Sequence, residues 1–139
     1  MTEPTEDDDY SPIPLDRAAV GRGGTLGLVV LVFGTIIGSI LDSPGVVAVT
    51  VLIALFVAGF VAGTLMPDEP MSNGLVAAEI AWIAWIPIRV LIWAVHKNGH
   101  ELFSGDKPAL PIGGLFVTAV IAAGLGVLGG LAGARRARR

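Results

Sequence analysis

The side chains that could do chemistry inside a membrane gather on one face of a single apolar segment, residues 74–95. Glu79 and Arg89 are the only charged residues embedded in a long apolar run of this chain, and all three tryptophans lie in the same run. An α-helix turns by about 100° per residue, so these side chains share roughly a third of its circumference. The resulting candidate polar face comprises Glu79, Trp82, Trp85, Arg89, Trp93 and His96.

Two interpretations of the candidate polar face compete. Embedded ionisable residues usually mark an ion path, a proton relay or a substrate site, which would suit a small channel or transporter subunit. Alternatively, Glu79 and Arg89 extend to opposite membrane interfaces while the tryptophans anchor the helix at the lipid headgroups. Their places near the two ends of the segment favour anchoring. About 15 Å of helix separates them, which is too far for a direct ion pair, and Pro87 between them predicts a bend.

The remaining sequence predicts no catalytic, cofactor or metal site. The chain has no cysteine, which excludes disulfides, zinc–thiolate sites and thiol nucleophiles. His96, His100 and Glu101 could suggest a metal site, but Asn98-Gly99 breaks the helix between the two histidines and removes helical ligand spacing. We therefore expect a protein that is not an enzyme and that carries no metal and no cofactor.

Four long apolar segments form the frame that positions the candidate polar face. They cover residues 24–41, 45–66, 74–95 and 112–134. Each is close to the roughly 20 residues that an α-helix needs to cross a hydrocarbon core of about 30 Å. Helices satisfy their own backbone groups in lipid, so the sequence predicts an all-α integral membrane four-helix bundle.

The breaks between the apolar segments contain residues that begin and end helices. Residues 42–44, Asp-Ser-Pro, predict a side-chain cap followed by proline in the first turn of the second helix. Residues 67–70 end the second segment, and Ser72 or Asn73 is expected to cap the third. Residues 96–111 form the only sizeable loop.

The two ends of the chain differ in charge. Residues 1–20 are rich in acidic residues and proline and poor in large apolar side chains, which predicts a disordered acidic tail before a membrane domain at residues 21–139. Arg17, Arg22 and the arginine-rich run 135–139 outnumber the two lysines of the long loop. By the positive-inside rule both termini are expected on the cytoplasmic side of the cell membrane. The terminal arginines should touch anionic lipid headgroups, and no nucleic-acid partner is expected.

Pairs of glycines four residues apart recur in three of the four segments. They are Gly34 and Gly38, Gly59 and Gly63, and Gly126 and Gly130. This spacing exposes bare backbone on one helix face and lets a neighbouring helix approach closely. One interpretation is packing within the chain, and the other is that one ridge faces outward and forms a homo-oligomer.

Several stretches give the chain a family resemblance. The run at residues 57–63, the run at residues 71–75 and the glycine-rich close that ends in arginines resemble uncharacterised small four-helix membrane proteins of halophilic archaea. The tryptophan-rich third segment and the loop at residues 96–111 depart from that pattern. The resemblance implies a four-helix architecture and no particular activity.

The sequence therefore favours a small multi-pass membrane protein of the packing, assembly or scaffold kind. Its expected partners are the lipid bilayer and either a second copy or a larger membrane complex. The alternative is a small channel or transporter subunit that uses the Glu79 and Arg89 face of the third helix.

Overall fold

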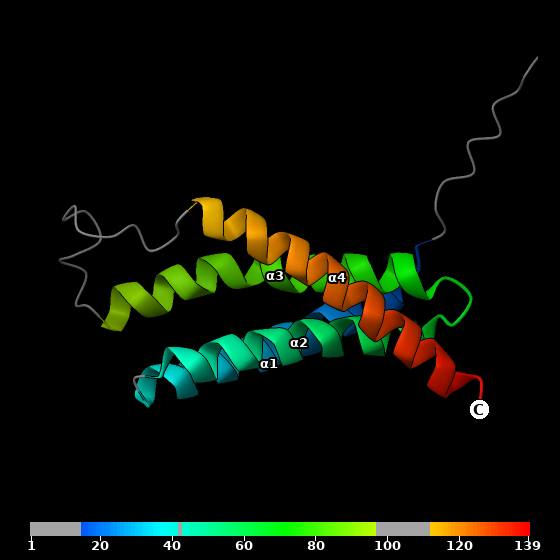
Figure 1. The fold of residues 1–139 in the computed structure, drawn as a ribbon, viewed down its shortest axis with the longest axis horizontal. Helices are drawn as coiled ribbons and strands as arrows, with labels where there is room; N and C mark the ends of the chain where they lie inside the picture. Colours follow the sequence, from blue (N-terminus) through cyan, green and yellow to red (C-terminus); the bar gives the residue numbers. More distant parts are fainter. Residues whose placement is uncertain (1–14, 42, 97–111) are drawn as a thin grey trace, which may run out of the picture.

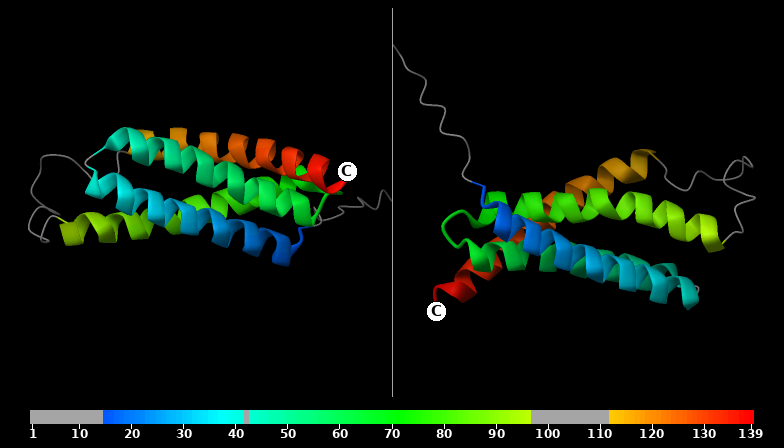
Figure 2. Two further views of the ribbon diagram at one scale, coloured as in Figure 1. Left: turned by 90° about the horizontal axis from the view of Figure 1, so that it is seen from below. Right: turned by 180° about the vertical axis from the view of Figure 1, so that it is seen from behind.

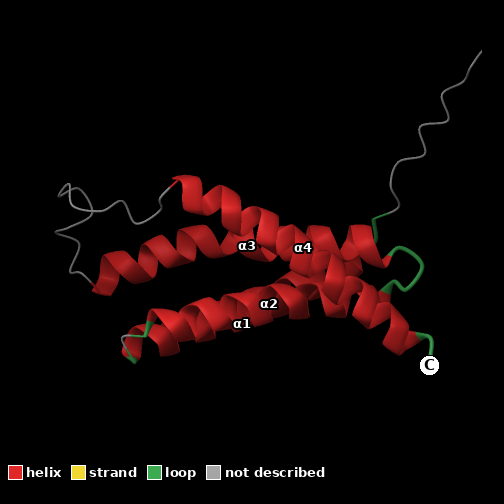
Figure 3. Ribbon diagram, viewed as in Figure 1, coloured by secondary structure: helices red, strands yellow, loops and turns green. Residues whose placement is uncertain are grey.

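The computed structural model describes residues 15–41, 43–96 and 112–139 and consists there of four α-helices without a strand (Figures 1 and 3). The helices are α1 (Arg17–Ile40), α2 (Pro44–Leu65), α3 (Pro70–His96) and α4 (Ile112–Ala137). Each contains a stretch long and apolar enough to cross a membrane, namely Arg17–Gly38, Gly45–Leu65, Pro70–Ile88 and Gly114–Ala137. The predicted all-α fold with four apolar helices is confirmed, and membrane insertion itself stays a prediction.

The helices run alternately up and down, so the start of α1 and the end of α4 lie at the same end of the bundle (Figures 1 and 2). We call this the termini end and the opposite one the loop end. Around the bundle the order is α1, α2, α4, α3, with each helix packed against the next. Across the diagonals, α2 and α3 are in contact, whereas the described parts of α1 and α4 are not. The bundle is thus flattened, with α2 and α3 closest to its axis.

Helix α1 begins at Arg17, although the apolar pattern predicts a first span from residue 24 and leaves residues 17–20 in the tail. The earlier start has a local cause in Asp16, whose carboxylate accepts hydrogen bonds from the backbone N–H groups of Ala18 (2.7 Å) and Ala19 (2.9 Å). An aspartate in this position satisfies N–H groups that have no partner inside the helix. The boundary predicted between residues 20 and 21 therefore moves back to Asp16. The rest of the predicted tail, residues 1–14, lies outside the described residues.

Helix α3 also begins earlier than predicted, at Pro70. Asn73 consequently lies inside the first turn and does not cap it. Its side chain is fully buried; Oδ1 accepts the backbone N–H of Asp16 at 3.0 Å, and Nδ2 donates to the carbonyl oxygen of Glu69 at 2.9 Å. One amide thus ties the start of α1 to the turn between α2 and α3. A buried polar group with both functions hydrogen-bonded avoids the cost of desolvation.

At the α1–α2 hairpin, Pro44 occupies the first turn of α2 as predicted, but Ser43 makes no side-chain cap hydrogen bond. The backbone N–H of Ser43 instead donates to the carbonyl oxygen of Gly38 at 3.0 Å. Asp42, the other predicted cap, lies outside the described residues. The tight turn is therefore closed by backbone groups.

Small residues fill the centre of the bundle. The alanines with no exposed surface are Ala54, Ala58, Ala62, Ala77, Ala78, Ala81 and Ala122. Residues of this size allow helix axes to come close enough for backbone atoms of neighbouring helices to touch. The core is therefore built by short side chains on α2, α3 and α4, with larger residues such as Leu31 and Leu55 filling the space beside them.

The closest approach joins α2, α3 and α4 at a set of glycines that we call the glycine junction. It consists of Gly59 and Gly63 on α2, Gly74 on α3, and Gly126 and Gly130 on α4. A Cβ added at Gly59 would collide with the carbonyl oxygen of Gly126, and one added at Gly63 with that of Gly130. A Cβ at Gly74 would lie 2.5 Å from the Gly126 carbonyl oxygen. At these positions the neighbouring backbone occupies the space of a side chain.

The first pair of spaced glycines faces a different neighbour. A Cβ at Gly34 would overlap the side chain of Thr50, and one at Gly38 would overlap that of Val47, both on α2. Together with the junction, all six glycines of the predicted ridges lie against helices of the same chain. By contrast, Gly21 and Gly124 have nothing within 4 Å of an added Cβ.

Replacing Gly130 with alanine is expected to destabilise the bundle, because the new methyl group would collide with the carbonyl oxygen of Pro70. Overpacking of this kind typically lowers the free energy of unfolding by about 1–3 kcal/mol. The measurement is equilibrium unfolding in mixed micelles with an increasing fraction of a denaturing detergent. Gly124→Ala on the same helix is the matched control, and it should equal or slightly exceed the wild type because alanine favours helix. Equal losses of unfolding free energy in Gly130→Ala and Gly124→Ala would contradict the close backbone contacts of the glycine junction.

Candidate functional site

The backbones of all six residues of the candidate polar face belong to α3. The side chains of Arg89, Trp93 and His96 lie outside the part of the chain that the structure describes, as do His100 and Glu101. The structure therefore places three members of the face, Glu79, Trp82 and Trp85. These three do not converge on a common site.

Trp85 points into the bundle and crosses to α1. Its side chain is 3% exposed, and its indole Nε1 donates a hydrogen bond to Thr35 Oγ1 at 3.0 Å. Thr35 Oγ1 in turn donates to the carbonyl oxygen of Leu31 at 2.7 Å. A threonine bonded to its own helix in this way presents a fixed lone pair to the incoming indole. The ring of Trp85 is therefore packed against other helices of the bundle and is not open to its surroundings.

Trp82, less than one turn earlier, crosses in the other direction to α4. Its indole Nε1 donates to Thr118 Oγ1 at 3.2 Å, and this hydroxyl lies 2.9 Å from the carbonyl oxygen of Gly114 and 3.0 Å from that of Leu115. The same arrangement, an indole N–H on a threonine that is bonded to its own helix, thus occurs twice. The two tryptophans thus connect α3 to the helices on either side of it, α1 and α4, and we call these two hydrogen bonds the indole braces. The helical wheel alone did not identify this role.

An apolar cavity of about 430 Å³ lies beside these braces, between α2 and α4. Its wall is formed mainly by α2, with Trp85 from α3 and Thr118 from α4. The residues that line it are Val47, Ala48, Val51, Leu52, Leu55, Trp85, Thr118 and Ile121. Both polar side chains in this wall already have hydrogen-bond partners, and Glu79 is not part of it. The cavity offers space for hydrocarbon and no charged group for catalysis or ion binding.

Glu79 is half-buried, and unlike Trp82 and Trp85 it makes no hydrogen bond or ion pair with another described residue. The outward-facing Ile80 and Ile83 beside it are 46% and 58% exposed. Since α3 begins at Pro70, about 14 Å of helix separates Glu79 from the termini end. The predicted start at residue 74 placed it about 8 Å from that end. Glu79 is thus further from the start of its helix than the sequence predicted, and whether its carboxylate lies at an interface stays a prediction.

The termini end holds polar contacts that the sequence did not reveal. Besides the bonds of Asn73, the guanidinium of Arg138 donates from Nη2 to the carbonyl oxygen of Pro67 at 2.7 Å. This bond closes the end of α4 onto the turn between α2 and α3. No group of three or more histidine or acidic side chains suited to a metal ion occurs within residues 15–41, 43–96 and 112–139. The polar groups at this end therefore hold helix ends together.

Comparison with known proteins assigns the chain to no family: no family model matches it, and no curated protein or solved structure does. Its function is consequently inferred from its own residues. Of the candidate polar face, the structure thus shows two tryptophans bonded to neighbouring helices and one carboxylate without a partner among the described residues.

A double-mutant cycle on Trp85→Phe and Thr35→Val should show direct coupling between the two side chains. Interhelical hydrogen bonds of this kind are worth about 0.6 kcal/mol on average and about 1.7 kcal/mol at most in membrane proteins. We expect a coupling free energy in this range, measured from the unfolding of both single variants and the double variant in mixed micelles. A cycle on Thr35→Val with Trp82→Phe is the control and should be additive, because Trp82 bonds to Thr118 instead. Additivity in both cycles would exclude the brace.

Proposed function

We propose that this protein is a non-enzymatic, multi-pass protein of the cell membrane that acts through helix packing, as an assembly or scaffold unit. The observation that carries this proposal is the use of Trp82 and Trp85 as braces between helices of one chain. Because these two side chains are hydrogen-bonded to neighbouring helices, they stabilise the bundle. The same holds for the glycines, whose close contacts also lie within the chain.

The outer surface supports a membrane location. Large apolar side chains are exposed on every helix, and they include Phe33, Ile40, Leu52, Leu91, Phe116 and Leu128. An exposed apolar surface of this extent suits lipid or another membrane protein. Arg17, Arg22 and the arginines of residues 135–139 all belong to the termini end, which favours a cytoplasmic position for that end.

Glu79 gives the proposal its most specific element, a contact with a second copy of the chain. A polar side chain on the outer half of a transmembrane helix gains from a hydrogen-bonding partner, since lipid tails supply none. Because the glycine ridges are occupied within the chain, Glu79 and the neighbouring Ile83 form the surface of α3 on which a second copy would pack. Two such carboxyl groups can share hydrogen bonds when at least one is protonated.

In the proposed membrane position Glu79 is near mid-depth, which also favours a second candidate function, a small channel or transporter subunit. Embedded carboxylates serve proton and cation pathways because their charge can change or be compensated there. This alternative needs a titratable group at residue 79, whereas the packing function needs only a hydrogen-bonding one. Replacing Glu79 with a residue that forms hydrogen bonds but does not titrate therefore distinguishes transport from packing.

Glu79→Gln and Glu79→Leu are therefore compared in vesicles by two measurements, self-association by energy transfer between labelled copies and proton or cation flux. Glutamine still forms hydrogen bonds, so we expect it to self-associate within about twofold of the wild type. Leucine removes the polar contact and should weaken self-association about three- to tenfold, in line with the strength of interhelical hydrogen bonds. Neither variant should differ in flux from the wild type or from empty vesicles.

Ile83→Leu on the same outward surface is the control, and it should leave both measurements unchanged. A wild-type flux that Glu79→Gln abolishes, in a protein that still folds, would establish the transport alternative. A wild type that stays monomeric at every protein-to-lipid ratio would exclude the self-contact.

A further inference from the structure

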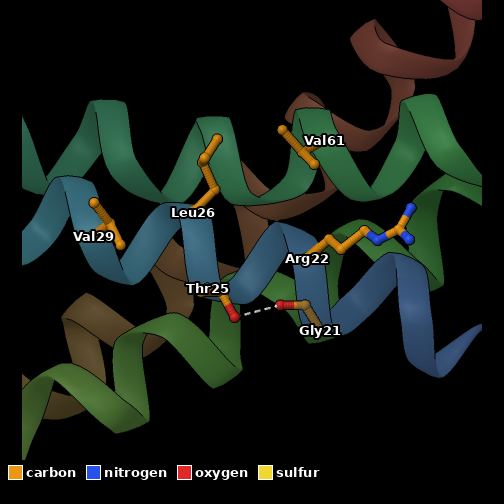
Figure 4. Close-up of a pocket in the computed structure, with 6 residues that line it drawn as sticks. All are labelled: Gly21, Arg22, Thr25, Leu26, Val29 and Val61. Atoms are coloured by element: carbon orange, nitrogen blue, oxygen red, sulfur yellow. Dashed lines mark hydrogen bonds between the residues drawn. The ribbon is translucent and has the colours of Figure 1, made fainter.

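A shallow groove of about 420 Å³ runs along the outer side of α1 and α2 near the termini end (Figure 4). It is lined by Gly21, Arg22, Thr25, Leu26, Val29 and Val61. All but Val61 come from α1, and Figure 4 shows Leu26 and Val61 close together where the two helices meet. The groove is open at Gly21, where nothing lies within 4 Å of the place where a Cβ would stand.

Within the part of the chain that the structure describes, Arg22 is the only charged residue that lines the groove. The other polar side chain, Thr25, donates its hydroxyl to the carbonyl oxygen of Gly21 at 2.8 Å and is thereby satisfied. Arg22 itself is exposed, and within the described residues its guanidinium makes no hydrogen bond or ion pair. The groove thus combines an apolar floor with one free cationic group that has five N–H donors.

The order of these groups along α1 matches the depth profile of a lipid. Arg22 lies five residues after the start of the helix, about 8 Å from the termini end. Val29 lies about 10 Å further along α1, toward the middle of the bundle. In the proposed orientation, the guanidinium stands near the headgroups of the cytoplasmic leaflet, and the apolar floor extends into the hydrocarbon.

We propose that this groove binds one anionic phospholipid of the leaflet at the termini end. The phosphate accepts hydrogen bonds from the guanidinium of Arg22, and one acyl chain lies along Leu26, Val29 and Val61. Charge complementarity selects an anionic headgroup because, among the described residues, no acidic side chain lines the groove to attract the cationic part of a zwitterionic one. A guanidinium suits this role because it bonds to two phosphate oxygens at once. The inference rests on the proposed membrane location but not on self-association.

The test compares binding of phosphatidylglycerol and phosphatidylcholine with identical acyl chains, offered in equal amounts in mixed micelles. Native mass spectrometry of the full chain gives the ratio of the two dissociation constants. A basic residue near a membrane surface contributes a factor of about five to the binding of anionic lipid. We expect the wild type to prefer phosphatidylglycerol at least fivefold and Arg22→Gln to bring the ratio close to one. Arg22→Lys should retain part of the preference.

Two further variants separate a groove from a bare surface charge. Arg17→Gln removes the same charge from a position about 140° around α1 and should leave the preference unchanged. Val29→Trp fills the groove while keeping Arg22, and it should weaken binding of phosphatidylglycerol about as strongly as Arg22→Gln. Val120→Trp, at a similarly exposed site on α4, is the control for the added bulk.

The proposed lipid site would be overturned if Arg17→Gln and Arg22→Gln changed the lipid preference equally, or if Val29→Trp did not change binding. Either result would leave only a general attraction of anionic lipid to a basic surface. An unchanged preference in Arg22→Gln would also overturn the proposed lipid site. The outcome is separable from the proposed function, because the Arg22 variants should self-associate like the wild type in vesicles. Conversely, Glu79→Leu should keep the lipid preference even where it loses self-association.

Discussion

The contact on which the rest of the bundle depends is the glycine junction, where α2, α3 and α4 meet backbone to backbone. In lipid, apolar side chains gain little by leaving their surroundings, so helices associate through packing and interhelical hydrogen bonds. Gly59 and Gly74 approach the same carbonyl group, that of Gly126, from two different helices. No residue with a Cβ could replace any of the three without moving a backbone. The junction therefore sets the spacing of α2, α3 and α4.

That spacing allows the polar contacts to form. Trp82 reaches Thr118 because α3 and α4 are held close at the junction, and Trp85 reaches Thr35 on the opposite side of α3. At the termini end, Asn73 bonds both to the start of α1 and to the turn that precedes α3. Each of these bonds satisfies groups that lipid cannot satisfy. The interior is thus fixed by close backbone contacts and completed by a small number of hydrogen bonds.

The length and composition of the apolar segments were sufficient to predict four helices, because the need for internal hydrogen bonds in lipid leaves no other structure for them. The starts of α1 and α3 were not predictable in this way. The turn that Asp16 caps precedes the long apolar run, and the side chain that accepts the backbone N–H of Asp16, that of Asn73, lies far away in sequence. The helical wheel placed the tryptophans on one face but could not assign each indole to a neighbour, since that depends on the threonines of α1 and α4. The distance of Glu79 from the start of its helix followed only once the first turn of α3 was known.

Arg22 and Glu79 both make no hydrogen bond or ion pair with another described residue, and they lie at different distances from the termini end. In the proposed membrane position, the guanidinium of Arg22 near the start of α1 is within reach of phosphate groups and water, so lipid alone can satisfy it. In the same position, the carboxylate of Glu79 is near mid-depth and meets only hydrocarbon on its open side, because neither headgroup nor bulk water extends that far. It can be satisfied there only by another protein surface or by a hydrated path. The depth of each group, set by where its helix begins, therefore decides which kind of partner it can have.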